Sequence, residues 1–300
     1  MPTRRTIGVE IGGTTLLAGA VDASLGVHHR TQRAIGGLDQ SALLDVAVDA
    51  VEEARNASGA EVAAVGFGIP SVSHQRSGGV RVSARTPLTS VRVADVMAER
   101  VGMPAFADTV ANVVALAEHR AGAARGARDA IVLTIDAGIN AGVILAGELQ
   151  HSKTRRPLIS GSGTELMDAT FELAREQPSS RLARAIESGR QPTGSLVTEL
   201  AHDGDRAALA VITRIGRQLG TAIAELVDAY HPQVVVVGGG VIAAGELLLA
   251  PARAELASHG AMPLGDEVPI VASRFGADAV IAGAAALAFD GLERRGSEAA

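Results

Sequence analysis

Two stretches of the chain share one pattern, and this repeat constrains the fold most strongly. Residues 7–22 read IGVEIGGTTLLAGAVD, and residues 131–149 read IVLTIDAGINAGVILAGEL. In each, an apolar strand runs into an acidic residue, a Gly-containing turn follows, and a second apolar strand returns. Glu10 of the first stretch aligns with Asp136 of the second. Because an internal repeat of this kind fixes the architecture, we expect two related α/β domains with a cleft between them.

The first turn has the chemistry of an anion site. Gly12 and Gly13 permit positive φ and remove the Cβ atoms that would keep a ligand away. Main-chain N–H groups of such a turn can hold a phosphate, and the hydroxyls of Thr14 and Thr15 add donors. Glu10 stands where a carboxylate can hold Mg²⁺ through water. Gly-rich hairpins without any ligand are common, but two copies with the acid in register favour nucleotide binding.

A third glycine-rich turn follows a buried strand at residues 234–237. Gly238, Gly239 and Gly240 then lead into an expected helix. A strand, a triple-glycine turn and a helix let a phosphate or a flat ligand approach backbone N–H groups at a helix N-terminus. A triple glycine can equally be only a tight turn, and the sequence leaves both interpretations open.

Composition excludes several other classes of protein. The net charge is −6 with no dense basic run, so we expect no nucleic-acid partner. The chain has no cysteine, which excludes disulfides and thiolate metal ligands. Lys153 is its only lysine and does not follow a glycine, so a P-loop is absent. No apolar run is long enough to span a bilayer, and residues 1–5 lead directly into the first strand, so we expect a cytoplasmic protein without membrane contact.

Apolar periodicity places the remaining elements. Residues 1–120 are expected to form an N-terminal domain and 121–300 a C-terminal domain, with the crossing at 121–128. Residues 71–87 are expected to be loop-like. The last helix is expected to start near Gly283, to pack back on the N-terminal domain over about 280–293, and to fray from 293 onward. The expected helices are 38–58, 93–101, 109–121, 165–175, 181–190, 196–201 and 206–230, and the further strands are 22–37, 61–67 and 103–107.

These pieces resemble the ROK family, the sugar kinases and repressors of the actin-like ATPase fold, over nearly the whole chain. The matching segments are 7–22, 62–70, 103–149 and, most specifically, 218–256, where a helix, His-Pro, a buried strand and Gly-Gly-Gly-Val follow one another. The resemblance implies a duplicated, ribonuclease H-like α/β fold. Because the first strand begins almost at residue 1, the chain is expected to resemble the kinase branch rather than the repressors.

The same resemblance implies a site for ATP with Mg²⁺ and for a small-molecule ligand such as a sugar. The nucleotide-binding residues would be Gly12, Gly13, Thr14, Gly138, Asn140, Gly238, Gly239 and Gly240. Glu10 and Asp136 would hold Mg²⁺. The family also implies a homodimer.

Departures from the family pattern bear on activity. The family's catalytic segment Glu-Asn-Asp-Ala-Asn is Asp108-Thr109-Val110-Ala111-Asn112 here. Val110 therefore occupies the position of the Asp that takes the proton from the sugar hydroxyl, and valine cannot accept one. A positioned base is worth roughly 10²–10⁴ in rate. Asp108 is a candidate replacement, although a strand-end or helix-capping carboxylate is the alternative interpretation.

The sugar and zinc motifs of the family are also altered. Its first acid is Asp where this chain has Glu10, and Ala137 replaces a phosphate-facing hydroxyl. The Gly-Glu-Ile-Gly-His motif has no match between His151 and Leu158, and the Cys-rich motif reads SGSGTELM at 160–167. We therefore expect no zinc site. His151 is expected to be a solvated loop histidine, and Glu165 a first-turn helix residue.

Two functional hypotheses follow from these observations. The first is an ATP-dependent kinase for a sugar hydroxyl with a rearranged site, in which ordinary hexokinase activity is absent or weak. The second is a non-catalytic pseudokinase that binds a nucleotide or another ligand, because base, sugar ligands and zinc ligands are lost together. A DNA-binding repressor lacks support, since no helix-turn-helix or basic face is found.

Overall fold

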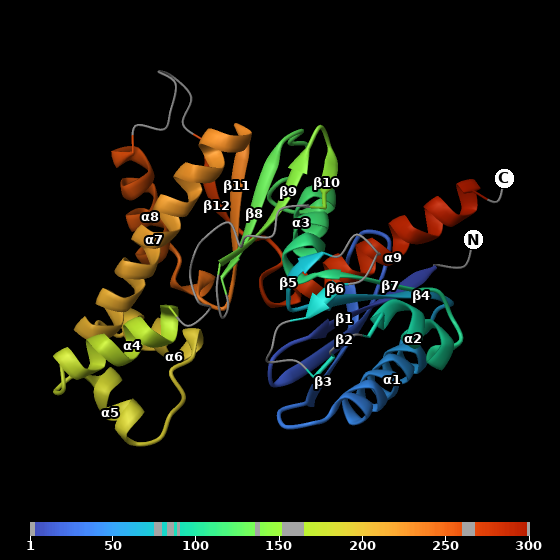
Figure 1. The fold of residues 1–300 in the computed structure, drawn as a ribbon, viewed down its shortest axis with the longest axis horizontal. Helices are drawn as coiled ribbons and strands as arrows, with labels where there is room; N and C mark the ends of the chain where they lie inside the picture. Colours follow the sequence, from blue (N-terminus) through green and yellow to red (C-terminus); the bar gives the residue numbers. More distant parts are fainter. Residues whose placement is uncertain are drawn as a thin grey trace.

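The computed structural model describes residues 4–74, 80–82, 87–88, 91–135, 139–151, 165–259 and 268–298. These residues form two five-stranded sheets, each covered by helices, and a separate two-stranded ribbon (Figure 1). The ribbon pairs β5 (Ser71–His74) with β6 (Val80–Val82), within the segment expected to be loop-like. That expectation is wrong for these residues.

The first sheet has the strand order β3-β2-β1-β4-β7. The first three strands pair antiparallel, and β4 and β7 continue the sheet parallel to β1. The outer face carries α1 (Gln40–Ala57) and α2 (Val93–Val101) over one apolar core. The strands are β1 (Arg5–Ile11), β2 (Thr15–Val21), β3 (Val27–Ala34), β4 (Val62–Ile69) and β7 (Ala105–Thr109).

The second sheet repeats this topology in the order β10-β9-β8-β11-β12. Again the first three strands are antiparallel, and the last two are parallel to the central strand. The internal repeat deduced from the two hairpins is therefore confirmed as a duplicated α/β fold. The strands are β8 (Ala130–Ile135), β9 (Ile139–Leu145), β10 (Glu148–Gln150), β11 (Val234–Gly239) and β12 (Ile270–Ala272).

Helix α7 (Arg206–Tyr230) organises the outer face of the second sheet. Asp205 caps its start by accepting a hydrogen bond from the Ala208 N–H at 3.0 Å. His231, at φ 47°, ends it before Pro232. Its apolar side chains recur at helical spacing and are buried against its neighbours. Those neighbours are α4 (Glu165–Glu176), α5 (Arg181–Glu187), α6 (Gly194–His202) and α8 (Glu246–Ser258).

Two helices cross between the sheets, α3 (Val110–Ala121) and α9 (Ala279–Glu298) (Figure 1). Helix α9 packs on β1 and β4 of the first sheet, whereas α3 packs on β8 and β9 of the second. The approach is too close for side chains. A Cβ at Gly8 would lie 1.8 Å from the carbonyl oxygen of Ile281, and one at Gly66 would lie 1.7 Å from that of Ala284. Glycine is therefore required on the strands beneath α9.

Polar contacts between α3 and its neighbours reinforce this crossing. The carboxylate of Glu118 is fully buried and accepts hydrogen bonds from Ser273 Oγ at 2.6 Å and from the N–H groups of Arg274 and Phe275 at 3.0 and 3.3 Å. Its other oxygen accepts from the Ala123 N–H at 2.7 Å. One side chain of α3 thus holds the turn after β12, from which the chain enters α9.

The C-terminal part of the chain differs from expectation in three places. Strand β12 was not predicted, because three residues are too short for a periodicity to show. Helix α9 starts at Ala279 rather than near Gly283. It also continues through residues expected to fray, and the guanidinium of Arg295 lies 5.0 Å from the ring centre of Phe106 there. The domain boundary at 120/121 stays a prediction.

The crossing can be tested with two identical substitutions on α9. A Cβ at Gly283 would lie 1.9 Å from the carbonyl oxygen of Val113, whereas nothing lies within 4 Å at exposed Gly296. We expect Gly283→Ala to lower the free energy of unfolding by at least ~1–3 kcal/mol through overpacking. Gly296→Ala should raise it slightly, since alanine favours the helix. Urea unfolding followed by circular dichroism measures both, and equal effects would contradict the packing described.

Candidate active site

The carboxyl ends of the parallel strands in the first sheet bring two carboxylates onto one face. Glu10 on β1 pairs with Gly68 on β4, and Gly68 pairs with Asp108 on β7. Side chains in register on neighbouring strands point to the same side, and two strand spacings amount to about 10 Å. The face is the one covered by α9, because the hydroxyl of Thr6 donates to the carbonyl of Ala285 from the same side of β1.

The two glycines of the first turn have different surroundings: Gly12 is crowded by the backbone, and Gly13 is open. The Gly12 N–H donates to the Thr15 carbonyl at 2.9 Å, and a Cβ at Gly12 would lie 2.7 Å from that same oxygen. Gly13 is exposed, and nothing lies within 4 Å of the position that a Cβ would take there. Thr14 is exposed, and its carbonyl accepts from the Ile35 N–H. These hydrogen bonds fix the backbone of the turn, while Gly13 and Thr14 remain exposed to solvent and to a ligand.

The second turn is described only at its edges. Ile135 at the end of β8 pairs with Ile139 at the start of β9. Asp136 and Gly138, expected to bind metal and nucleotide, lie outside the described residues. Asn140 is exposed and pairs with Thr134 across the hairpin.

The three glycines of the third turn differ in what the backbone demands of them. Gly238 and Gly239 are the last residues of β11 and pair with Thr134 and Ile135 of β8. Gly239 has φ +99°, and a Cβ there would lie 2.3 Å from the Ile135 carbonyl oxygen, so the backbone itself requires glycine. Gly240 donates its N–H to the same carbonyl at 3.0 Å and has open space where a side chain would be.

The expected helix does not start directly at these glycines. A 3₁₀ turn at Ile242–Ala244 comes first, and α8 begins only at Glu246. The prediction of a helix N-terminus at the glycine turn is therefore wrong. Gly245 occupies the cap with φ 56°, which separates the turn from the helix.

Asp108 is held at the junction of β7 and α3. Its Oδ1 accepts the Thr109 N–H at 2.6 Å and the Asn112 side-chain amide at 2.8 Å, and Thr109 itself caps α3. One oxygen of Asp108 therefore acts as the strand-end carboxylate that the alternative interpretation expects. Val110 is the first residue of α3 and packs against a core cluster that includes Val113 and Val280.

His151 is exposed and lies outside the strands, as expected of a solvated loop histidine, but it is not isolated. It follows β10 directly, and its Nδ1 lies 3.4 Å from Oδ2 of Asp108. The side-chain exposures are 51% for His151 and 2% for Asp108. Sequence reasoning missed this pair because 43 positions, counted from 108 to 151, separate the two residues. No local motif signals a contact between strand ends of two different sheets.

The described residues contain no cluster of three or more His, Asp or Glu side chains able to hold a metal ion. In phosphoryl-transfer sites Mg²⁺ is commonly held by only one or two carboxylates together with substrate phosphates and water, so such a site needs no cluster of this size. Glu165 begins α4, as the expectation of a first-turn residue requires.

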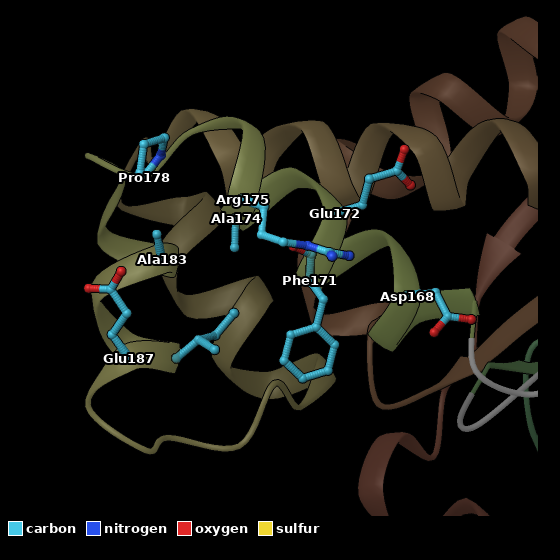
Figure 2. Close-up of a pocket in the computed structure, with 9 residues that line it drawn as sticks. Asp168, Phe171, Glu172, Ala174, Arg175, Pro178, Ala183 and Glu187 are labelled. Atoms are coloured by element: carbon cyan, nitrogen blue, oxygen red, sulfur yellow. The ribbon is translucent and has the colours of Figure 1, made fainter.

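A cavity of about 860 Å³ lies apart from these strand ends, between α4 and α5 (Figure 2). The ring of Phe171 projects from α4 into it, and Arg175, Ala183 and Glu187 also line it. It contains none of the residues expected to bind nucleotide or metal, so it is a feature of the helical layer rather than of the strand ends.

The duplicated sheets, the paired turns and the helices crossing between them define an actin-like ATPase fold. The family model described as "ROK family" matches residues 6–154 and 172–290, and the chain therefore belongs to the ROK family. Within the part of the chain that the structure describes, no helix is long and apolar enough to cross a membrane.

Several named relatives are glucokinases. The chain is 28% identical to a glucokinase of Thermotoga maritima, with 96% of this chain and 98% of the relative covered. It is 26% identical to a glucokinase of Streptomyces coelicolor, with 94% and 97% covered. Among solved structures, a ROK family glucokinase from Streptomyces griseus in complex with glucose and AMPPNP superimposes with a TM-score of 0.84 at 26% identity, covering 95% and 99%.

The difference between Gly239 and Gly240 in the third turn can be tested by substitution. We expect Gly239→Ala to lower the free energy of unfolding by about 1–3 kcal/mol, because its φ is positive and its Cβ would meet Ile135. Gly240→Ala, one residue away, should leave it within about 0.5 kcal/mol. Denaturant midpoints of the two variants measure the difference. Equal loss in both would show that the turn needs glycine throughout for structural reasons alone.

Proposed function

We propose that this protein transfers the γ-phosphoryl group of ATP to a hydroxyl of a small molecule such as a sugar, with little activity toward ordinary hexoses. The observation that carries the proposal is the row Glu10–Gly68–Asp108 at the strand ends of the first sheet. Ligands of open α/β sheets bind outside the carboxyl ends of the parallel strands. The glucokinase relatives, one of them in complex with glucose and AMPPNP, support the reaction class.

The proposed roles follow from position. Gly13 and Thr14 would contact phosphate oxygens, together with Gly138 and Asn140 of the second turn. Gly240 would lie beside the adenosine part, with Gly238 and Gly239 shaping that turn. Mg²⁺ would be held near Glu10 with help from Asp136, and it would neutralise charge on the transferred phosphoryl group. A homodimer and a cytoplasmic location stay predictions.

Poor hexose turnover is proposed because several groups are replaced together. Val110 stands where the family pattern has the proton-accepting Asp, and the Glu and His of the sugar motif have no match near His151. The thiolate zinc ligands are absent from a chain that has no cysteine. A pseudokinase that binds nucleotide without transferring phosphate is the alternative, and the same replacements favour it.

The first test is ADP release from Mg–ATP across a panel of hexoses, amino sugars and cyclitols. We expect turnover with a member other than glucose, and a glucose rate that is low or absent. Val110→Asp should not raise the glucose rate appreciably, because the sugar-binding residues are missing as well. A robust glucose kinase activity in that single variant would refute the proposed specificity. A folded sample that turns over nothing would favour the pseudokinase.

Magnesium binding is tested separately from catalysis. We expect Glu10→Gln to weaken binding of Mg–AMPPNP by roughly tenfold, because a carboxylate that holds the metal is lost. Binding of AMPPNP in EDTA should be unchanged by the substitution. Isothermal titration calorimetry measures both, and Glu99→Gln, an exposed position on α2, is the matched control. An equal loss with and without magnesium would remove Glu10 from the metal site.

A further inference from the structure

The contact between His151 and Asp108 joins the two halves of the molecule at the strand ends. Asp108 lies at the end of β7 in the first sheet, and His151 follows β10 at the edge of the second. Strand β10 lies near α3 (Figure 1), and Asp108 comes shortly before the first residue of α3. The imidazole Nδ1 is 3.4 Å from carboxylate Oδ2. A histidine and a carboxylate from different sheets thus meet where the proposed phosphoryl transfer would occur.

Asp108 is poorly placed to take a proton from a substrate itself. Its Oδ1 already accepts hydrogen bonds from the Thr109 N–H and the Asn112 side chain, and the carboxylate is almost completely buried. Its Oδ2 faces the imidazole of His151. A carboxylate held in this way is suited to orient a neighbouring group rather than to meet a substrate hydroxyl.

His151 has the complementary properties. Half of its side chain is exposed, and a neutral imidazole that donates its Nδ1–H to a carboxylate keeps a lone pair on Nε2. A carboxylate that fixes the tautomer of a histidine base in this way is a recurrent arrangement in catalysis. Distances in such pairs are often long without substrate and shorten in the reacting complex.

The pair differs from an ordinary ion pair at the surface. Ion pairs between exposed side chains contribute little to folding, and here only one partner is exposed. The buried partner already receives two donors from its own segment. Both of these donors go to Oδ1, and the imidazole of His151 lies at the other oxygen, Oδ2.

We infer that His151 is the proton acceptor of the phosphoryl transfer and that Asp108 is its positioning residue. This inference rests on the proposed function. It places the missing base on the strand end of the second sheet, instead of at Val110, the position that the family pattern uses.

The step balances without any further reagent. Nε2 of His151 takes the proton of the acceptor hydroxyl as that oxygen bonds to the γ-phosphorus of ATP. The bond from the γ-phosphorus to the β–γ bridging oxygen breaks, and its electron pair leaves with ADP. The proton on the imidazole passes to water after the products dissociate.

The experiment compares ADP release by the wild-type protein, His151→Gln and Asp108→Asn, with Mg–ATP and the fastest acceptor of the panel. We expect His151→Gln to lower kcat by roughly 10²-fold or more, with the KM for ATP unchanged. Asp108→Asn should lower kcat by at least tenfold through loss of the correct tautomer. His259→Gln alters another histidine, at the end of α8, and should leave kcat unchanged.

Two further readouts separate a base from a structural residue. Added imidazole should restore part of the activity of His151→Ala, which a merely structural histidine would not allow. In ¹⁵N NMR spectra, neutral His151 should carry its proton on Nδ1 in the wild-type protein, and Asp108→Asn should change that tautomer. The His151→Gln spectrum identifies the signal, and circular dichroism confirms that each variant is folded.

The outcomes distinguish failure of this inference from failure of the proposed kinase function. Turnover that His151→Gln leaves unchanged would overturn the role of His151 while the kinase proposal stands. If no acceptor turns over, hydrolysis of ATP by water becomes the readout for the same variants. Wild-type protein that binds Mg–AMPPNP but hydrolyses nothing would overturn the inference and leave a nucleotide-binding protein. Failure to bind Mg–AMPPNP would overturn the proposed function and the inference together.

Discussion

The close contact of α9 with the first sheet and of α3 with the second is the constraint on which the rest of the structure depends. Gly8 and Gly66 allow the backbone of α9 to lie against β1 and β4, and Gly142 allows α3 to lie against β9. A helix this close to a sheet cannot slide along it, because sliding would bring a residue with a side chain against a carbonyl group. The end of β7 in the first sheet and the end of β10 in the second are thereby close enough for Asp108 to contact His151.

This constraint also explains why glycine content is a poor guide to the site on its own. Gly12 and Gly239 are required by their own turns, and Gly8, Gly66 and Gly283 by helix packing. Gly13 and Gly240 differ, because nothing lies within 4 Å of the position that a Cβ would take there. Packing therefore does not require glycine at these two positions, and a ligand could approach them. A sequence motif counts all of these alike, and only the surrounding backbone separates them.

The sequence predicted what depends on local periodicity and missed what depends on distant segments. The hairpin repeat and α7 were recognisable because apolar residues recur with periods of 2 and 3.6 along continuous stretches. Strand β12 and the 3₁₀ turn before α8 are too short to carry such a signal. The contact of His151 with Asp108 could not be predicted at all, since it depends on how β10 is placed beside α3.

Moving the proton acceptor from the start of α3 to the end of β10 has a consequence for the substrate. The acceptor hydroxyl must lie close both to the γ-phosphorus and to the base, because phosphoryl transfer depends mainly on positioning. A base on β10 therefore requires the hydroxyl to approach from the side of the second sheet. A hexose oriented for a carboxylate at Val110 would present its hydroxyl to a valine instead. The same rearrangement that supplies a new base thus explains why ordinary hexoses should be poor substrates, and it links the identity of the acceptor to the position of His151.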